Sequence, residues 1–193
     1  MSTPTIDLLQ QTGLRPGQWT LDPHHSNVVF SIRHLGLAKV RGRFDHVAAT
    51  LDVGETVESA LVRATVDLAS INTSNADRDA HLRSTDFFDT ATHPTMEFVS
   101  TRIVPAADGL TLTGDLTLNG ITRPITLAVE LNGGALFAPT GKWHAGFSAT
   151  GAIKRSEFGI EFGLLPMGGD KLALGDEVKF EVDVEFVEPA AED

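Results

Sequence analysis

The chain has 193 residues, 41% of them hydrophobic, and its 26 acidic and 15 basic residues give a formal net charge of −11 at pH 7. A field of that sign repels phosphate backbones, so nucleic acid is not expected as a partner. The sequence contains no cysteine, which excludes disulfides, thiolate metal sites and thiol nucleophiles. The length suits one domain with a sizeable core.

The first residues, MSTPTIDLLQQTGLRPGQW, do not resemble a secretory signal. Asp7 and several polar residues stand where such a signal needs a basic start and an apolar run of about 7–15 residues. No run of about 18 consecutive apolar residues occurs, so no transmembrane segment is predicted. We therefore expect a cytoplasmic protein. Residues 1–18 are interpreted as an N-terminal extension, in which residues 6–12 could form a turn or two of helix.

The first clear strand contains Val28, Phe30 and Ile32, which occupy alternate positions and so share one face. The same parity continues to His34, which places a histidine on the apolar face. Two interpretations stay open for it. It is either a buried neutral imidazole bonded to the backbone or to an acid such as Asp86, or a residue that contacts a ligand.

The second strand is predicted over residues 39–52. Its apolar positions change parity between Phe44 and Val47. This shift predicts a bulge near Asp45 and His46, where the strand bends around a barrel corner.

A short helix is predicted over residues 76–84, because Asn75 is a suitable N-cap and Asp77 and Asp79 place negative charge in the first turn. Alternating patterns indicate further strands over residues 60–70, 95–104, 110–118, 125–131, 143–154 and 177–187. Turn signals separate several of them, namely Asp108-Gly109, Asn119-Gly120 and Asn132-Gly133-Gly134. Residues 188–193 form a small acidic tail.

About eight long antiparallel strands would leave unpaired edges in an open sheet, and closing the sheet into a barrel removes them. A barrel of this size is either filled by side chains or holds one small ligand. Small residues within the strands are expected to leave space inside, although they could equally face outwards around a solid interior. These small residues are Ser100, Gly114, Ala128, Ala145, Ser148, Ala149 and Gly151.

Five blocks of sequence carry a more specific signal through their order and spacing. They are WTLDPHHSNVVFSIRHL at 19–35 with GRF at 42–44, RDAHLRSTDFFD at 78–89, HPTMEF at 93–98, GDLTLNGITRPI at 114–125 and RSEFGI at 155–160. Together, and over nearly the whole of residues 19–187, they resemble the YceI-like family of polyisoprenoid-binding proteins.

This resemblance implies an all-β fold, a lipocalin-like, extended, eight-stranded antiparallel β-barrel with one or two short helices, over residues 19–187. It also implies a long apolar tunnel that takes an isoprenoid lipid, such as a polyprenyl diphosphate or an isoprenoid quinone, as a carrier without other cofactors. Members are often dimeric, so a homodimer is a further expectation. The predicted lumen residues are Phe30, Ile32, His34, Phe44, Phe98, Val182 and Val184.

A polar head group at the tunnel mouth would need hydrogen-bond donors, which arginine or histidine supplies. The candidates are Arg78, His81, Arg83, Asp86, Phe87 and Arg155. Alternatively, the first two arginines pair with the neighbouring acids Asp79 and Asp86 and fix the helix on the barrel. Phe87 and Phe88 are expected mainly to plug the barrel end or to pack beneath the helix, and Arg155 could equally form a surface ion pair.

The seven histidines show no HxH or HxxxH spacing on a common element, so no metal site is predicted. The stretch Asp22–Ser26 is expected to cap a turn, and no motif predicts catalytic residues. Two alternatives to a lipid carrier stay open. One is a metal-dependent or lipid-modifying enzyme built from His34, His81 and Asp86, and the other is a stress-linked binder of a smaller apolar molecule.

Overall fold

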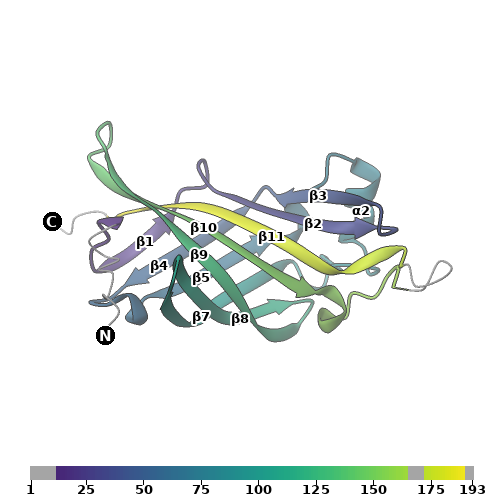
Figure 1. Ribbon diagram of the computed structural model, residues 1–193. Coiled ribbons are helices and arrows are strands. Elements are labelled where there is room, and N and C mark those ends of the chain that lie inside the picture. Colours follow the sequence, from purple (N-terminus) through teal and green to yellow (C-terminus); the bar gives the residue numbers. More distant parts are fainter. Residues whose placement is uncertain (1–11, 165–171, 190–193) are drawn as a thin grey trace.

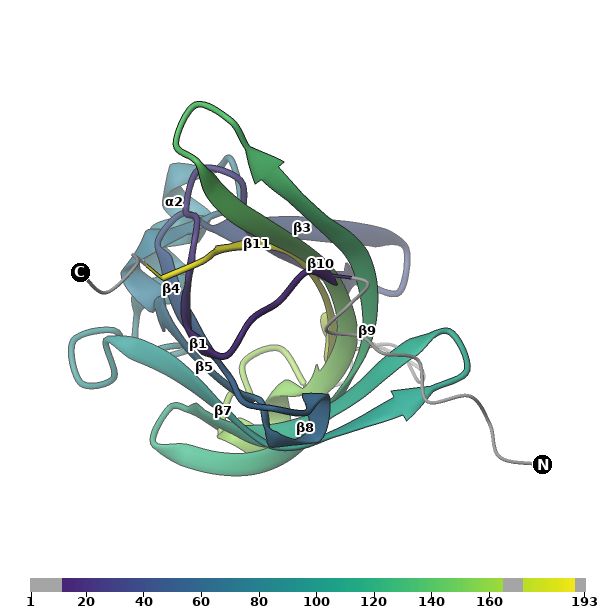
Figure 2. The same ribbon diagram turned by 90° about the vertical axis from the view of Figure 1, so that its left-hand side faces the viewer.

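The computed structural model describes residues 12–164 and 172–189. These residues form eleven antiparallel strand segments in the order β1-β4-β5-β7-β8-β9-β10-β11-β2-β3-β6, and a pairing of β1 with β11 closes the sheet into a barrel (Figures 1 and 2). The segments are β1 (Gly17–Leu21), β2 (Asn27–His34), β3 (Ala38–Phe44), β4 (Val47–Val53), β5 (Leu61–Asp67), β6 (Ile71–Asn72), β7 (Thr95–Ala106), β8 (Gly109–Leu118), β9 (Ile121–Phe137), β10 (Lys142–Lys154) and β11 (Leu174–Val187).

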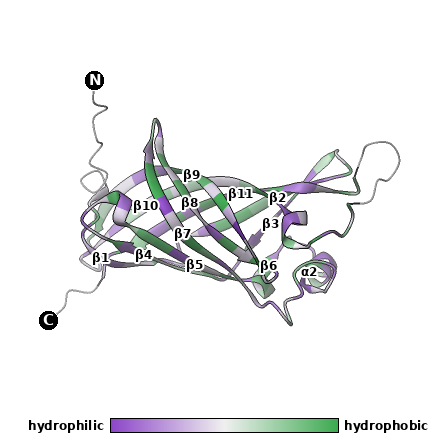
Figure 3. Cartoon of the chain, turned by 90° about the horizontal axis from the view of Figure 1, so that it is seen from below, coloured by the Kyte–Doolittle hydropathy of each residue, from purple (hydrophilic) through white to green (hydrophobic). Residues whose placement is uncertain are grey.

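The eleven segments make eight long strands, because three of these strands are each interrupted once. β1 and β2 form one long strand, because both pair with β11. β3 and β4 form the next, because β3 pairs with β2 and β4 pairs with β1. β5 and β6 form the third, because β6 pairs with β3 and β5 pairs with β4. The eight-stranded antiparallel barrel expected from the sequence is therefore confirmed. β1 lies at one end of the barrel, whereas α2 (Ala76–Arg83) lies at the other, where β10 ends and β11 begins (Figures 1 and 3).

The predicted bend at Asp45 and His46 is present, but as a break between β3 and β4 rather than a bulge within one strand. At this break, hydrogen bonds from side chains take the place of the backbone pairing between strands. The Asp45 carboxylate accepts hydrogen bonds from Arg43 at 2.6 Å and from Asn72 at 3.0 Å, and the His46 N–H donates to the Ser70 hydroxyl at 3.0 Å. Such local bonds compete with strand pairing and let the chain turn the corner.

The predicted turn at Asn132–Gly134 is wrong, because these residues lie inside β9. The register with β10 steps from Gly133 opposite Gly146 to Leu131 opposite Phe147, so Asn132 is an extra residue in a bulge. The hairpin turn comes after Phe137, whose carbonyl accepts hydrogen bonds from the N–H groups of residues 140 and 141. Glycine is common in bulges as well as in turns, so the Asn-Gly-Gly sequence was wrongly interpreted as a turn.

The predicted helix is confirmed as α2. The Asn75 side chain accepts a hydrogen bond from the Arg78 N–H at 2.9 Å, and the N–H of Ser84 donates to the His81 carbonyl at the other end. Three 3₁₀ turns accompany it, namely η1 (Val57–Ser59), η2 (Leu68–Ser70) and η3 (Arg155–Phe158). The interpretation of residues 6–12 as helical lies outside the described residues, except for Thr12. Within the described residues, none of the helices has the length and apolar character needed to cross a bilayer.

Apolar and polar residues alternate along the strands (Figure 3), and apolar side chains line the inside of the barrel. Two of the small residues predicted inside lie outside instead. Ala128 is exposed, and the Ser148 hydroxyl bonds with Asn132 and Asp183 on the outer face. Ser100, Ala145 and Ala149 are buried as expected.

Two inward glycines leave room that aromatic rings occupy. A Cβ at Gly114 would overlap the ring of Phe98 and the backbone carbonyl of Val99, and one at Gly151 would overlap the ring of Phe180. A phenyl ring that covers a glycine on a neighbouring strand stabilises the sheet where the glycine offers no side chain. These two positions therefore hold rings rather than empty space.

We expect Gly114→Ala to lower the free energy of unfolding by about 1–3 kcal/mol, because the new methyl group overpacks the interior against Phe98. Gly146→Ala is the matched control, since a Cβ there would meet Asn132 at an ordinary 3.4 Å on the outer face. Urea denaturation of both variants measures the difference. Equal stability of the two would contradict the packing of Phe98 described above.

Candidate functional site

The barrel encloses a cavity of about 310 Å³. Apolar side chains from all eight long strands line it, and Arg155 is the one polar residue among those that do. Several lining residues, including Val28, Phe30 and Val182, are only partly buried although they point inwards. Their remaining exposure is to the cavity itself, so the interior is hollow and not packed solid.

Six of the seven predicted lumen residues line this cavity, namely Phe30, Ile32, Phe44, Phe98, Val182 and Val184. His34 is the exception, because it is exposed at the end of β2. The pairs Ile32–Val178 and His34–Leu174 are two residues apart on β2 but four residues apart on β11, so the pairing between them is irregular. The parity that placed His34 inside assumes a regular ladder, and this irregularity breaks it.

The end of the cavity beneath α2 is closed by apolar side chains. Leu82, Phe87 and Phe88 line it, and Phe88 packs edge-on against Phe44 with ring centroids 6.1 Å apart. Phe87 is 7% exposed and, like Phe88, lines the cavity, as expected for rings that plug the barrel end. Leu82 was not among the predicted lumen residues, since only the turn of the chain around α2 brings it to the barrel.

Arg78 and Arg83 do fix α2 on the barrel, but through different partners from those expected. Arg78 donates to the hydroxyl and the carbonyl of Thr73, both at 2.8 Å, and Arg83 donates to the carbonyls of Ala69 and Ile71. Asp79 accepts bonds from Thr73 instead of from an arginine. Because their guanidinium groups are committed to the backbone and neither residue lines the cavity, these arginines are poorly placed to hold a head group.

His81 and Asp86 form an exposed pair, with the histidine Nε2 2.8 Å from a carboxylate oxygen. The His81 ring packs edge-on against Phe87 and Phe162, at centroid distances of 5.1 and 4.8 Å. Neither member of the pair lines the cavity. Among the described residues, His34, His81 and Asp86 do not form a metal-binding group. The site considered for a metal-dependent enzyme is therefore not formed by these three residues.

Arg155 lies in η3 and is only 3% exposed, so the surface ion pair considered for it is wrong. Its guanidinium donates to the carbonyls of Gly175 at 2.8 Å, Ile160 at 3.0 Å and Leu174 at 3.1 Å. Burial lowers the pKa of this guanidinium, and the charge of nearby Asp176 partly offsets the effect. These bonds account for three of the five N–H groups of Arg155, and the residue borders the cavity.

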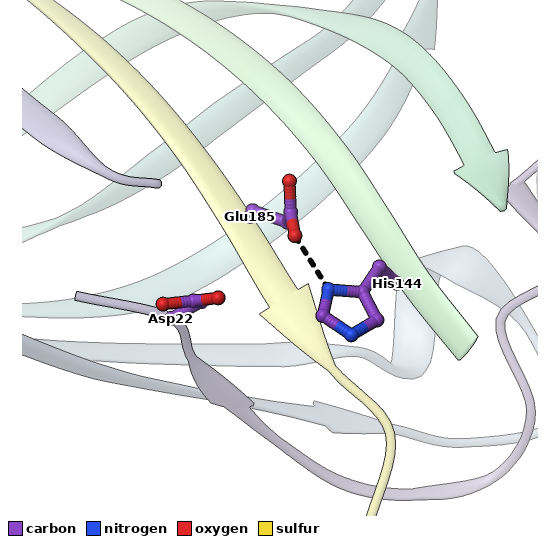
Figure 4. A group of neighbouring side chains, drawn as sticks. All are labelled: Asp22, His144 and Glu185. Carbon is purple, nitrogen blue, oxygen red and sulfur yellow. Dashed lines mark hydrogen bonds and ion pairs between the residues drawn. The ribbon is translucent and has the colours of Figure 1, made fainter. Parts of the chain in front are cut away.

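A second group of polar residues gathers on the outside of the barrel, at the β1 end. It comprises Asp22, His25, His144 and Glu185, three of which Figure 4 shows together. The turn predicted at residues 22–26 is present, because the Asp22 carboxylate accepts a bond from the His24 N–H at 2.8 Å. A hydrogen bond with His25 lowers the pKa of Asp22 and raises that of His25. Because Asp22, His144 and Glu185 lie far apart in the sequence, no local motif predicts that they meet.

A sequence model of the YceI-like domain matches residues 19–186, which is most of the chain. The protein belongs to the YceI-like family. Protein YceI from Escherichia coli O157:H7 is 42% identical to it over 143 residues, 74% of each chain. A UPF0312 protein from Pseudomonas aeruginosa (strain LESB58) is 38% identical over the same share.

Solved structures share the barrel of this YceI-like protein. A Campylobacter jejuni YCEI protein is 30% identical, with a TM-score of 0.68 over 82% of this chain and 91% of that one. Burkholderia cenocepacia BcnA, at 23% identity, has a TM-score of 0.73 over 86% and 98% of the two chains. A polyisoprenoid binding domain from Saccharophagus degradans, at 18% identity, has a TM-score of 0.66 over 89% and 98%. The lipocalin-like YceI fold expected from the sequence is confirmed.

Proposed function

We propose that this YceI-like protein binds an isoprenoid lipid, a polyprenyl diphosphate or an isoprenoid quinone, inside its barrel and carries it without making or breaking a bond. The observation that carries the proposal is the cavity, whose lining is apolar apart from Arg155. A polyprenyl chain has no strong hydrogen-bonding groups, so aliphatic and phenyl walls satisfy it. Each Å² of apolar surface that leaves water contributes about 25 cal/mol, before the cost of ordering the chain.

The shape of the interior supports an elongated guest. The lining residues extend from Leu14 and Leu21 at the β1 end to Leu82 and Ile160 at the α2 end. The volume of about 310 Å³ lies within the range of small-molecule pockets, at its lower limit of about 300 Å³. A tail that runs along the barrel axis would contact every strand, which makes affinity depend on chain length.

Arg155 is the residue best placed to meet the polar end of such a lipid. Its three backbone bonds hold the guanidinium beside the cavity, and we assign its two other N–H groups as the donors to a diphosphate or quinone oxygen. The other mouth candidates, Arg78, His81 and Arg83, are bonded to α2 and its surroundings. The likeness in fold to a domain described as polyisoprenoid binding is consistent with this choice of ligand.

Organic extraction of the purified protein, followed by mass spectrometry, tests the proposal. We expect one isoprenoid lipid per barrel. After delipidation, geranylgeranyl diphosphate should bind saturably, and more tightly than palmitate, an acyl chain of equal main-chain length. Recovery of only a small non-isoprenoid molecule, with no preference for the isoprenoid probe, would overturn the proposal and favour the binder of a smaller apolar ligand.

A further inference from the structure

The polar group at the β1 end lies where the barrel closes. Asp22 and His25 occupy the corner between β1 and β2, His144 lies near the start of β10, and Glu185 lies near the end of β11. Figure 4 shows the His144 ring and the Glu185 carboxylate facing one another, with the Asp22 carboxylate beside them on the corner after β1. Three chain segments, separated by more than a hundred residues between Asp22 and His144, thus meet at one point on the outer face.

The ligand atoms of this group are close enough to share one ion. One atom each from Asp22, His144 and Glu185 lies within 4.8 Å of the others, and this is the one such trio among the described residues. His144 Nδ1 lies 2.5 Å from Glu185 Oε1. His25 Nδ1 lies 2.9 Å from Asp22 Oδ2 and 4.0 Å from Glu185 Oε1, which places a fourth donor beside the three.

The backbone holds these donors in place before any ion arrives. The Asp22 N–H donates to the Glu185 carbonyl at 2.8 Å, and the Glu185 N–H donates to the Ser26 hydroxyl at 3.1 Å. One oxygen of Asp22 caps the turn, and the other faces the group, where it lies 2.9 Å from His25 Nδ1. The position across the ladder from Glu185 is Gly146, which has no side chain to separate Glu185 from His144.

The donor set selects the chemical class of the ion. Imidazole and carboxylate together suit zinc and its neighbours in the first transition row, whereas calcium and magnesium prefer oxygen ligands alone. With bonds of about 2.0–2.2 Å, the ligands of a tetrahedral zinc ion lie about 3.4 Å apart. The separations here, from 2.5 Å for His144 and Glu185 to the 4.8 Å limit, bracket that value. The two carboxylates also balance the double positive charge.

We propose that Asp22, His144 and Glu185, with His25 beside them, form a binding site for a zinc-like divalent cation that links the strands where the barrel closes. β1 pairs with β11 only through Thr20–Val187 and Leu21–Phe186. An ion at the site would tie the corner after β1 to both β10 and β11 just beyond these pairs. Because Asp22, His144 and Glu185 converge only in the folded chain, the ion would stabilise the folded state.

The test uses the full chain, purified without a histidine tag and stripped with a chelator. Titration calorimetry with Zn²⁺ should show one ion per chain, and the melting temperature should rise with zinc concentration. Co²⁺, used as a spectroscopic probe, should give the visible absorption of a tetrahedral site with nitrogen and oxygen ligands. Absence of saturable binding, with an unchanged melting temperature, would overturn the proposal.

Two near-isosteric variants and one control locate the ion. Glu185→Gln removes one carboxylate, and Asp22→Asn keeps an oxygen for the turn while it removes the charge. Each should weaken zinc binding by more than about tenfold and abolish the zinc-dependent rise in melting temperature. His46→Gln is the control, because His46 has a single carboxylate neighbour, Asp67, at 3.4 Å. Zinc binding that survives both variants unchanged would place the ion elsewhere and refute the site.

Discussion

Val182→Arg is expected to abolish isoprenoid uptake. Val182 points into the cavity from the middle of β11, with Ala149 of β10 and Val28 of β2 paired beside it. The new guanidinium would have to lie along the path of the lipid tail, without a counter-ion, and an unpaired buried charge is strongly unfavourable. Mass spectrometry of the organic extract and titration with geranylgeranyl diphosphate measure the loss.

A second variant keeps this test meaningful if the arginine prevents folding. Ala149→Phe narrows the cavity at the same level with an apolar ring, and should weaken isoprenoid binding at least about tenfold, or 1.4 kcal/mol. Glu181→Arg introduces the same charge on the outer face of the same strand, and should leave lipid content unchanged. A folded Val182→Arg or Ala149→Phe protein that carries the wild-type amount of isoprenoid would rule out the lumen as the binding site.

Arg155→Met should lower the free energy of unfolding by about 4 kcal/mol. The substitution leaves three carbonyl groups, of Ile160, Leu174 and Gly175, without their donor, and each buried acceptor left unpaired costs about 1–3 kcal/mol. Arg155→Lys should fall in between, because one ammonium group does not span all three carbonyls. Equilibrium denaturation in urea measures the effect.

Arg33→Met is the matched control for Arg155. Arg33 is exposed on β2 near the same end of the barrel and donates to one carbonyl, that of Leu37, at 3.3 Å. Its loss should change stability by less than about 0.5 kcal/mol. If the two variants were equally stable, the guanidinium of Arg155 would not be anchoring η3 to β11, and its assignment to the lipid head group would lose its structural basis.

Alternation of apolar and polar residues predicted most of the barrel, because a strand pleat has a strict period of two wherever its ladder is regular. β11 and β2 illustrate this, since Val182, Val184, Phe30 and Ile32 all line the cavity as expected. The prediction failed for His34, where β11 bulges against β2. Irregular pairing depends on two strands at once, so the pattern of either strand alone does not reveal it.

The polar residues were harder to place, because their partners come from the folded backbone. Arg155 was considered for a surface ion pair, yet it lies buried and bonded to carbonyls of two other segments. The cluster around Glu185 had no signature for a similar reason. Asp22 and His144 become neighbours only when β1 closes on β11, and no spacing along the sequence encodes that closure.

The phenyl rings that cover glycines affect the width of the cavity. At Gly114 and Gly151, and at Gly42 beside Phe30, a phenyl ring occupies the space where a Cβ would lie. Adding one methyl group to any of these glycines would push a ring toward the axis. The width of the cavity thus depends in part on three residues with no side chain of their own, and changes at them should alter which apolar chains the proposed site accepts.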